Sequence, residues 1–274
     1  MKKISFIRLI EYLALILGAL IMVFPFYWMF LSAFKTPAEV NTSPPTWLPT
    51  KFNFDNFGYV FDAAPFAKYF LNSLIVTISV VSLSLFVTIL TAFAFSRLRF
   101  PGRDILFSLF ISLMMVPFEM IVITNYGTVA DLGLIDNIVA LIIPFTSSIF
   151  YTYVLRNFFL SIPDSLYFSA KVDGASNWQY LWKIMVPIAK PSLVTIALLN
   201  SISSWNAFLW PLLVINQKVN RTLPLGLYAF ITDAGVRYER LMAAATMVVI
   251  PIIILFLVAR RSIVNGVARG GLKG

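Results

Sequence analysis

The chain has 274 residues, of which 59% are hydrophobic and 12% charged, whereas soluble domains are about 45–50% apolar and about 25% charged. This composition excludes an ordinary water-soluble fold. The net charge of +9 would suit nucleic acid, but basic residues between long apolar runs are what membrane insertion requires, so we expect no nucleic-acid partner. The absence of cysteine and histidine excludes disulfides, thiol nucleophiles, imidazole bases and the usual zinc sites.

The first long apolar run covers residues 12–33. A helix of that length extends ~33 Å at ~1.5 Å per residue, enough to cross the ~30 Å hydrocarbon core of a bilayer. Lys2, Lys3 and Arg8 precede the run, as basic residues also precede the apolar part of a secretory signal peptide. The run is too long for such a peptide and lacks a clear cleavage site, so we expect a first span, with Glu11 at the membrane interface.

Five further apolar runs predict an all-α, polytopic membrane protein with six transmembrane helices. They cover residues 70–95, 104–125, 137–158, 191–215 and 241–259, and each can cross a bilayer as a helix. An even number of spans places both termini on one side. Fourteen of the 21 lysines and arginines fall on that side and seven on the other, which predicts cytoplasmic termini. We expect one transmembrane domain over residues 1–274, with external segments at 34–69 and 216–240.

The second span carries small hydroxyl residues along one narrow face. Such residues allow helices to approach closely, so helix packing is their expected role. They are Ser73, Thr77, Ser84, Thr88 and Thr91.

The fifth span carries a polar stripe, because Asn200, Ser203, Asn206 and Trp210 fall on about a third of the helix circumference. Such a stripe can line a solute path, or it can pack against neighbouring helices. We take Ser203, Asn206, Trp205 and Trp210 as candidate pathway residues, although Trp205 also suits a membrane interface.

Glu119 is expected at membrane depth, ~22 Å along the third span. An ionisable group there is a functional candidate by default, although it can instead bond to backbone groups freed by Pro117. We therefore add Glu119 to the candidate pathway residues.

The inner segment 159–190 contains two helix-start signals and one stop signal. Ser161-Ile-Pro-Asp164 has a proline where a first turn accepts one, and Asp173-Gly174 predicts a stop because glycine adopts the left-handed conformation. Ser176 and Gln179 have the spacing of a capping box. The segment therefore predicts two short amphipathic helices with a fixed bend, the alternative being an unstructured connector.

The chain shows no energy source of its own. A phosphate-binding loop requires G-x-x-x-x-G-K-[ST] between a strand and a helix, and the pair Gly266 and Gly271 is followed only by Leu272-Lys273 and the end of the sequence. A G-x-S-x-G nucleophile motif is also missing. If transport is driven by ATP, a partner must hydrolyse it.

The segment from Phe168 onward resembles the cytoplasmic EAA loop of ABC-importer permeases, whose pattern is E-A-A-x-x-D-G-A and then I-x-L-P. Asp173, Gly174, Ala175 and Pro187 match that pattern. Ala170 matches its second alanine.

Two positions depart from that loop, because Phe168 stands where the family usually has glutamate and Ser169 where it has the first alanine. The resemblance extends over almost the whole chain. Taken together, the chain is similar to the second permease subunit of carbohydrate importers of the maltose/glycerol-phosphate type. The other matching features are Phe24-Pro-Phe-Tyr27, Ser32-Ala-Phe-Lys35, Asn72-Ser73, Trp205-Asn206 and the tail, Val264-Asn-Gly266 to Gly274.

The resemblance implies a non-catalytic subunit with the type I importer fold in a bacterial inner membrane. A related permease would pair with it in the bilayer, and an external binding protein would deliver a sugar, oligosaccharide or glycerol-phosphate. Two ATPase subunits would bind ATP and Mg, so no cofactor or metal is expected in this chain. ATPase closure would then alternate access through the loop, where the coupling residues would be Tyr167, Phe168, Ala170, Val172, Asp173, Gly174, Ala175, Trp178 and Pro187.

The cytoplasmic tail 264–274 would end at the ATPase dimer interface. The residues expected there are Gly270, Gly271, Leu272, Lys273 and Gly274.

Because Phe168 cannot form the ionic contact that the family glutamate would make with the ATPase, some other interaction must hold this contact. Burying an aromatic side chain can stabilise a contact by about 2–3 kcal/mol, whereas an exposed ion pair contributes ~0–1 kcal/mol. We expect Phe168, Tyr167 and Val172 to form an apolar knob, and Asp173-Gly174 to set the bend.

Two other functions fit parts of the sequence. An ion-coupled secondary transporter would show internal repeats and several intramembrane carboxylates, but the sequence has no evident repeat and one such glutamate. An intramembrane enzyme would need a nucleophile and a base, which the lack of histidine and cysteine disfavours. Carbohydrate import is therefore the expected function.

Overall fold

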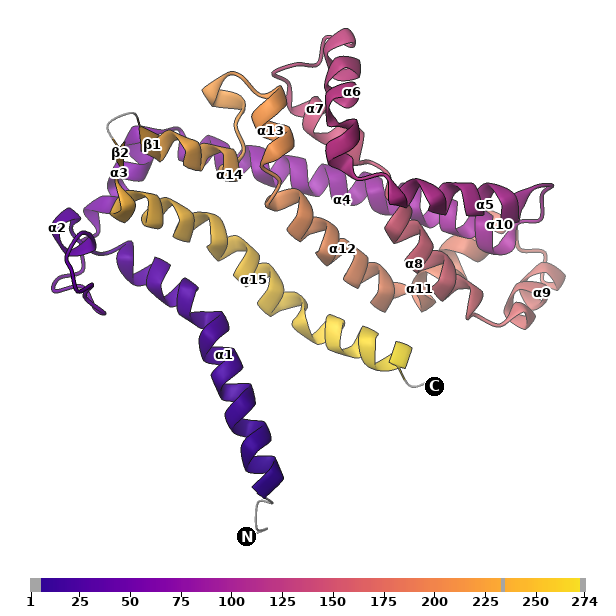
Figure 1. Ribbon diagram of the computed structural model, residues 1–274. Helices are drawn as coiled ribbons and strands as arrows, with labels where there is room; N and C mark the ends of the chain where they lie inside the picture. The colour runs from indigo at the N-terminus through magenta and orange to yellow at the C-terminus, as the bar shows by residue number, and fades with distance from the viewer. Residues whose placement is uncertain (1–5, 233–234, 272–274) are drawn as a thin grey trace. The chain divides into compact units, whose positions relative to one another are not determined.

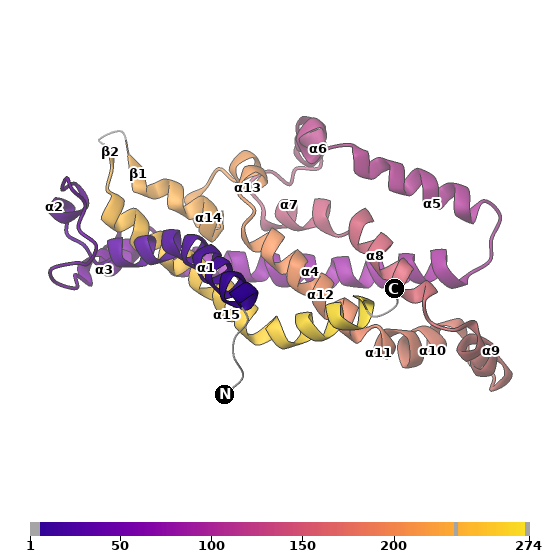
Figure 2. The same ribbon diagram turned by 60° about the horizontal axis from the view of Figure 1, so that its bottom comes forward.

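The structure is a computed structural model that describes residues 6–232 and 235–271 (Figures 1 and 2). Its contacts form two compact units. Unit 1 comprises Met1–Phe66 and Gly226–Pro251, and unit 2 comprises Ala67–Leu225 and Ile252–Gly274. The last helix, α15 (Tyr238–Gly271), continues from one unit into the other.

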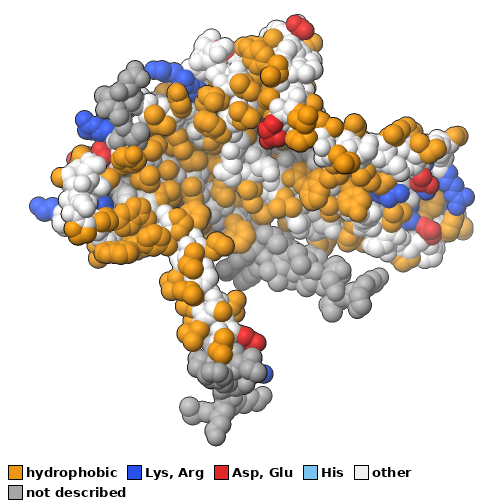
Figure 3. All heavy atoms as spheres, in the orientation of Figure 1, with side chains coloured by type: hydrophobic (Ala, Val, Ile, Leu, Met, Phe, Trp, Pro, Cys, Tyr) orange, Lys and Arg blue, Asp and Glu red, His pale blue; other side chains and the backbone are white. Residues whose placement is uncertain are grey.

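Unit 1 contains α1 (Phe6–Ser32) and the first half of α15. Apolar side chains cover α1 (Figure 3), and the most apolar part of this helix has none of its residues buried. A helix that is apolar all round is suited to lipid or to a protein interior. The shorter elements are α2 (Pro37–Val40), α3 (Asp55–Ala63), the 3₁₀ turn η5 (Leu227–Phe230) and an antiparallel pair of two-residue strands, β1 (Ile231–Thr232) and β2 (Gly235–Val236).

Polar contacts fix the segment that follows α1. Thr36 caps α2 in a capping box with Glu39, and the amides of Thr36 and Thr50 donate to the Glu39 carboxylate at 2.8 and 2.7 Å. These hydrogen bonds, that from the Thr36 amide first, lower the pKa of Glu39 to about 2. The Lys35 ammonium, buried beside them, donates to the carbonyl of Thr46. The start of the predicted external segment is therefore an ordered structure.

Unit 2 is organised around α4 (Phe66–Arg97). Its first half packs against α6, α7 and α13, and its second half packs against α8, α9, α10 and α12. Helices α9 to α11 lie at one end of α4 (Figures 1 and 2). The elements are α5 (Arg103–Ser112), η1 (Leu113–Met115), α6 (Phe118–Asp131), α7 (Ile138–Ile142), η2 (Ile143–Phe145), α8 (Ile149–Leu160), α9 (Asp164–Val172), α10 (Asn177–Tyr180), the π-helical η3 (Leu181–Met185), α11 (Val186–Ile188), α12 (Lys190–Trp205), α13 (Leu209–Val214), η4 (Lys218–Asn220) and α14 (Leu223–Gly226).

The predicted all-α membrane fold is confirmed, apart from the short strand pair. Within the described residues, three helices are long and apolar enough to cross a membrane, or up to six if each bent pair is one span. The three are Ile10–Ser32, Phe66–Arg97 and Tyr238–Val258. The bent pairs are Arg103–Met115 with Phe118–Asp131, Ile138–Phe145 with Ile149–Leu160, and Asn177–Ile188 with Lys190–Trp205, bent by 98°, 42° and 78°.

The prediction of one continuous helix over residues 104–125 is wrong. The chain bends by 98° between α5 and α6, because Pro117 has no N–H to continue a helix and restricts the residue before it. Val116 is accordingly extended, with φ −86° and ψ 109°. Glu119 lies in the first turn of α6 with an exposed side chain, so the depth assigned to it along a straight helix no longer follows.

The prediction of one helix over residues 191–215 is also wrong. Helix α12 ends at Trp205 and α13 begins at Leu209. In a continuous helix the ring of Pro211 would clash with the carbonyl of Ala207, four residues earlier. In the first turn of α13 that proline is tolerated, because no intrahelical bond needs its N–H there. The predicted polar stripe is therefore divided between two helices.

The hydroxyl residues of α4 are largely buried, as helix packing predicts. Ser73, Thr77, Ser84 and Thr88 are each less than a tenth exposed. The Ser73 hydroxyl also accepts a hydrogen bond from the Leu223 amide at 2.8 Å, which ties the start of α4 to the first residue of α14.

Candidate functional site

The bend between α9 and α10 is set by Gly174. This residue has φ +77°, in the left-handed region that favours glycine. The Gly174 amide donates to the Lys171 carbonyl at 3.1 Å, and the Ala175 amide donates to the Ala170 carbonyl at 2.9 Å. These two bonds form a Schellman motif, which satisfies the carbonyls at the end of α9. The predicted stop at Asp173-Gly174 is confirmed.

The predicted start of the second short helix is confirmed as well. Ser176 is the N-cap of α10, where it accepts from the Gln179 amide at 3.1 Å while the Gln179 side chain accepts from the Ser176 amide at 2.8 Å. The first helix begins at Asp164, with Pro163 as its N-cap residue. The segment is thus a structured bend rather than an unstructured connector.

Tyr167 holds α9 against α10 from the inner side of the bend. Its hydroxyl donates to the Asn177 side-chain oxygen at 3.0 Å, and its ring lies 5.0 Å from that of the buried Tyr180. Ala170 is buried in the same cluster, and Ala175 packs against it. The placement of Tyr167 in an outward knob is therefore corrected: this side chain faces the helices of unit 2.

Three apolar side chains of this segment point away from the cluster. Phe168 is 55% exposed, Val172 is 87% exposed and Trp178 is 57% exposed. Phe168 and Val172 lie four residues apart on α9 and so share one face. Asp173, Gly174 and Pro187 are exposed too. We call Phe168, Val172 and Trp178 the apolar face of the bend.

Charged side chains gather at the same end of unit 2, around α5, α9 and α10 (Figure 3). They include exposed Arg99, Asp104, Asp164, Lys171 and Lys183. An apolar face with charged neighbours is typical of a surface that meets another protein in water rather than lipid.

The predicted pathway residues do not all meet. Ser203 and Trp210 line a cavity of about 120 Å³ in unit 2 together with Asn200 and Thr222. The walls are otherwise mainly apolar, and the Trp210 ring nitrogen donates to the Ala140 carbonyl at 2.9 Å. The cavity has room for several water molecules.

Two polar atoms at this cavity have no hydrogen-bond partner among the described residues. They are Nδ2 of Asn200 and the hydroxyl of Thr222, and both side chains are more than nine-tenths buried. Asn200 belongs to the predicted polar stripe but was not among the candidates. Thr222 follows the fifth span, and its burial here depends on chain folding that no local sequence signal indicates.

The other three candidates lie elsewhere. Trp205 is buried, with its ring 5.8 Å from that of Phe70. Asn206 is exposed at the end of α12, where its side-chain amide donates to the Ile202 carbonyl at 3.0 Å. Glu119 is outside the cavity lining. The structure therefore brings together only part of the predicted set.

The expected tail begins within α15. Gly270 and Gly271 are the last residues of α15. Leu272, Lys273 and Gly274 lie outside the described residues.

Known proteins resemble this chain over nearly its full length. Residues 84–269 match the family described as binding-protein-dependent transport system inner membrane component. The diacetylchitobiose uptake system permease of Streptomyces coelicolor is 35% identical over 92% of each chain. The arabinooligosaccharides transport system permease of Halalkalibacterium halodurans is 33% identical over 93% of each chain.

A solved structure has the same fold. It is a crystal structure of a bacterial ABC transporter involved in the import of the acidic polysaccharide alginate, and one of its chains superposes with a TM-score of 0.84 at 27% identity. The likeness covers 95% of this chain and 99% of that one.

Proposed function

The chain belongs to the binding-protein-dependent transport system inner membrane components, and on this premise we propose how it contributes to carbohydrate import. As a permease subunit of an ABC importer, it forms half of the translocation path. Relatives that carry arabinooligosaccharides and diacetylchitobiose support an oligosaccharide as cargo. ATP hydrolysis takes place on partner subunits, and access alternates as they close.

The single observation that carries the coupling role is the ordered bend with its apolar face. A loop can transmit a movement only if it is stiffer than the joint that it moves. The Schellman motif and the capping box supply that stiffness on the two sides of Gly174. Phe168, Val172 and Trp178 supply the surface that docks in a groove of the ATPase.

Phe168 is the centre of this docking surface. Its ring is 6.0 Å from that of Tyr167, which supports it from behind, while more than half of its own surface is free to be covered. Burial of a phenylalanine contributes about 2–3 kcal/mol, more than the ~0–1 kcal/mol of an exposed ion pair. The loss of the family glutamate therefore need not weaken docking.

The remaining partners complete the importer. A second, related permease pairs with this chain in the bilayer, two ATPase copies dock on the side of the bend, and an external binding protein delivers the solute. A solved relative is an alginate ABC transporter in complex with a pentasaccharide-bound periplasmic protein, which supports the last of these. Both termini are cytoplasmic, as the distribution of basic residues indicates.

The cavity at Asn200 and Ser203 is the part of this subunit that we assign to the path. Its unpartnered amide and hydroxyl groups suit water or sugar hydroxyls, because both donate and accept hydrogen bonds. At about 120 Å³ it is a local recess in the path, to which the partner permease contributes the remaining wall.

Cross-linking tests the docking surface directly. The chain contains no cysteine, so Val172→Cys introduces one unique thiol on the apolar face. In the full complex this thiol should cross-link to the ATPase through a short bifunctional reagent. Ile123→Cys, on α6 and 81% exposed against 87% for Val172, is the matched control and should not cross-link to the ATPase. Equal cross-linking at both positions, or none at position 172, would refute the assignment.

A further inference from the structure

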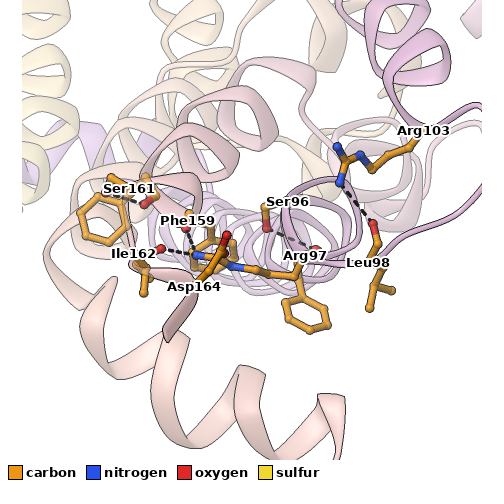
Figure 4. A network of polar contacts seen from close by, with 10 residues as sticks. Ser96, Arg97, Leu98, Arg103, Phe159, Ser161, Ile162 and Asp164 are labelled. Carbon is orange, nitrogen blue, oxygen red and sulfur yellow. Dashed lines mark hydrogen bonds and ion pairs between the residues drawn. The ribbon is translucent and has the colours of Figure 1, made fainter. Parts of the chain in front are cut away.

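Arg97 fastens the end of α4 to the corner between α8 and α9 (Figure 4). It is the last residue of α4, and its side chain is only 4% exposed. The guanidinium donates to the carbonyls of Phe159 and Ile162 at 2.6 and 2.5 Å and forms an ion pair with Asp164. One side chain therefore holds the end of α8, the turn and the start of α9.

The charges at this corner are favourably placed relative to the dipoles of the two helix ends. A cation is favourable at a helix C-terminus and a carboxylate at an N-terminus, and Arg97 reaches the end of α8 while Asp164 opens α9. A buried guanidinium is stable only when it is paired and hydrogen-bonded. Three contacts meet that condition at the two terminal nitrogens, while Nε has no hydrogen-bond partner among the described residues. The contacts of the terminal nitrogens fix the direction in which α9 leaves α8.

A second arginine makes the reciprocal connection. Arg156 lies on α8, and its Nε donates back to the Phe95 carbonyl of α4 at 3.1 Å. Its guanidinium also lies 3.9 Å from the centre of the Phe107 ring on α5. Helices α4 and α8 are thus connected by Arg97 from α4 and by Arg156 from α8. The contact between Arg156 and the Phe107 ring also connects α5 to α8.

We propose that Arg97 is a positioning residue for coupling: it makes α4 follow α9, so that a displacement of the docked bend reaches the helix that lines the cavity. Val76 and Val80 of α4 form part of that lining. Without the connection, the short turn between α8 and α9 would absorb the movement. This inference rests on the proposed function, in which the bend between α9 and α10 docks on the ATPase.

A distance measurement tests the connection itself. Leu83 on α4 and Ser169 on α9 are both exposed, so cysteines there can carry spin labels in this cysteine-free chain. Pulsed electron paramagnetic resonance on the full complex should give the same narrow distance distribution without nucleotide and with trapped ATP. With Arg97→Gln the distribution should broaden and differ between the two states. A distance that changes between states in the parent, or that stays unchanged in Arg97→Gln, would overturn the proposal.

Transport per ATP hydrolysed is the functional readout, measured in proteoliposomes with complex recovery as the check on assembly. Arg97→Gln should lower this ratio by at least about fivefold, the smaller end of a typical coupling between sites. Arg97→Lys should lower it less, because an ammonium keeps the charge but cannot reproduce the planar donor set. Arg8→Gln, at an exposed arginine of α1 outside the docking surface, is the control and should behave as the parent.

If Arg97→Gln prevents assembly, Arg97→Lys tests the proposal instead, by the spin-label distance and by the transport per ATP hydrolysed. Parental coupling together with a parental distance distribution in Arg97→Lys would then overturn the proposal. Failure of the underlying function is distinguishable. In that case Val172→Cys does not cross-link to the ATPase even with Arg97 intact. If only the Arg97 proposal fails, that cross-link forms and the Arg97 variants still couple normally.

Discussion

Replacing Gly174 tests whether the fixed bend between α9 and α10 couples ATP hydrolysis to transport. The structure separates two possible effects of a new side chain. A Cβ atom built at Gly174 meets no other heavy atom within 4 Å, so the substitution causes no clash. Its whole effect comes from the backbone, because φ +77° is a conformation that side chains with a Cβ rarely adopt.

The expected magnitude follows from that backbone conformation. The left-handed conformation costs an L-residue about 1–2 kcal/mol, and a β-branched residue lies at the upper end. A penalty of that size changes the population of the native bend by a factor of about 5–30. Asparagine tolerates the conformation better than other residues with a Cβ. Gly174→Val should therefore uncouple transport most, Gly174→Ala less and Gly174→Asn least.

Uptake and ATPase activity, measured together in proteoliposomes of the full complex, check this order. Assembly should be the same for all three variants, since residue 174 is exposed and its Cβ has free space. The reasoning is refuted if Gly174→Val couples as well as Gly174→Asn. A loss that followed side-chain volume rather than backbone preference, with asparagine worse than alanine, would refute it as well.

Three further predictions concern other parts of the chain. Phe168→Ala should lower uptake per ATP more than Phe168→Leu, which keeps most of the apolar contact, and equal coupling in both would exclude the docking role. The hydrogen bonds that Glu39 accepts lower its pKa from the ordinary 4.5 to about 2, so its stabilisation of the first external segment is present above pH 4.5 and lost as the pH falls towards 2. Glu39→Gln should therefore speed hydrogen exchange at the Thr50 amide at pH 7 but much less at pH 2.5, and an equal increase at both would contradict the assignment. Deletion of residues 270–274 should lower stimulated ATP hydrolysis without loss of assembly, whereas unchanged hydrolysis would indicate an ordinary frayed end.

The bend was predictable because its signals are local. Glycine at position 174 and the spacing of Ser176 and Gln179 specify backbone conformations within a few residues, and such conformations need little help from the rest of the fold. The positions of the long apolar helices were predictable for a similar reason, since length and hydropathy decide whether a segment can cross a bilayer. Helix α4 accordingly covers the predicted second span.

The breaks in the spans were less predictable, although prolines mark them. A proline inside an apolar run can kink a helix slightly or end it, and in membranes neighbouring helices often satisfy the freed backbone groups. At Pro117 the chain bends by 98°, and before Pro211 the helix stops. The sequence alone does not distinguish these outcomes, because neighbouring helices determine them.

The pathway candidates were divided between different places for the same reason. Residues at helical spacing share one face only if the helix is continuous, and α12 ends at Trp205, before Asn206. Asn206 lies at the helix end with an exposed side chain, while Ser203, about one turn earlier on α12, and Asn200, nearly two turns earlier, line the cavity. Thr222 joined them from a segment that follows the span, so sequence spacing could not have included it.

The two aromatic residues at the start of the bend show how the surrounding helices decide function. Tyr167 and Phe168 are adjacent, so on a helix they point about 100° apart, and either one could have faced outward. Ala170 and Tyr180 decide between them, because their burial against α4 and α8 turns the Tyr167 side of α9 inward. Phe168 and Val172, four residues apart, are left together on the exposed face. Phe168, which stands where the resembled family usually has glutamate, therefore lies on the side of α9 that another protein can cover, as the proposed apolar contact with the ATPase requires.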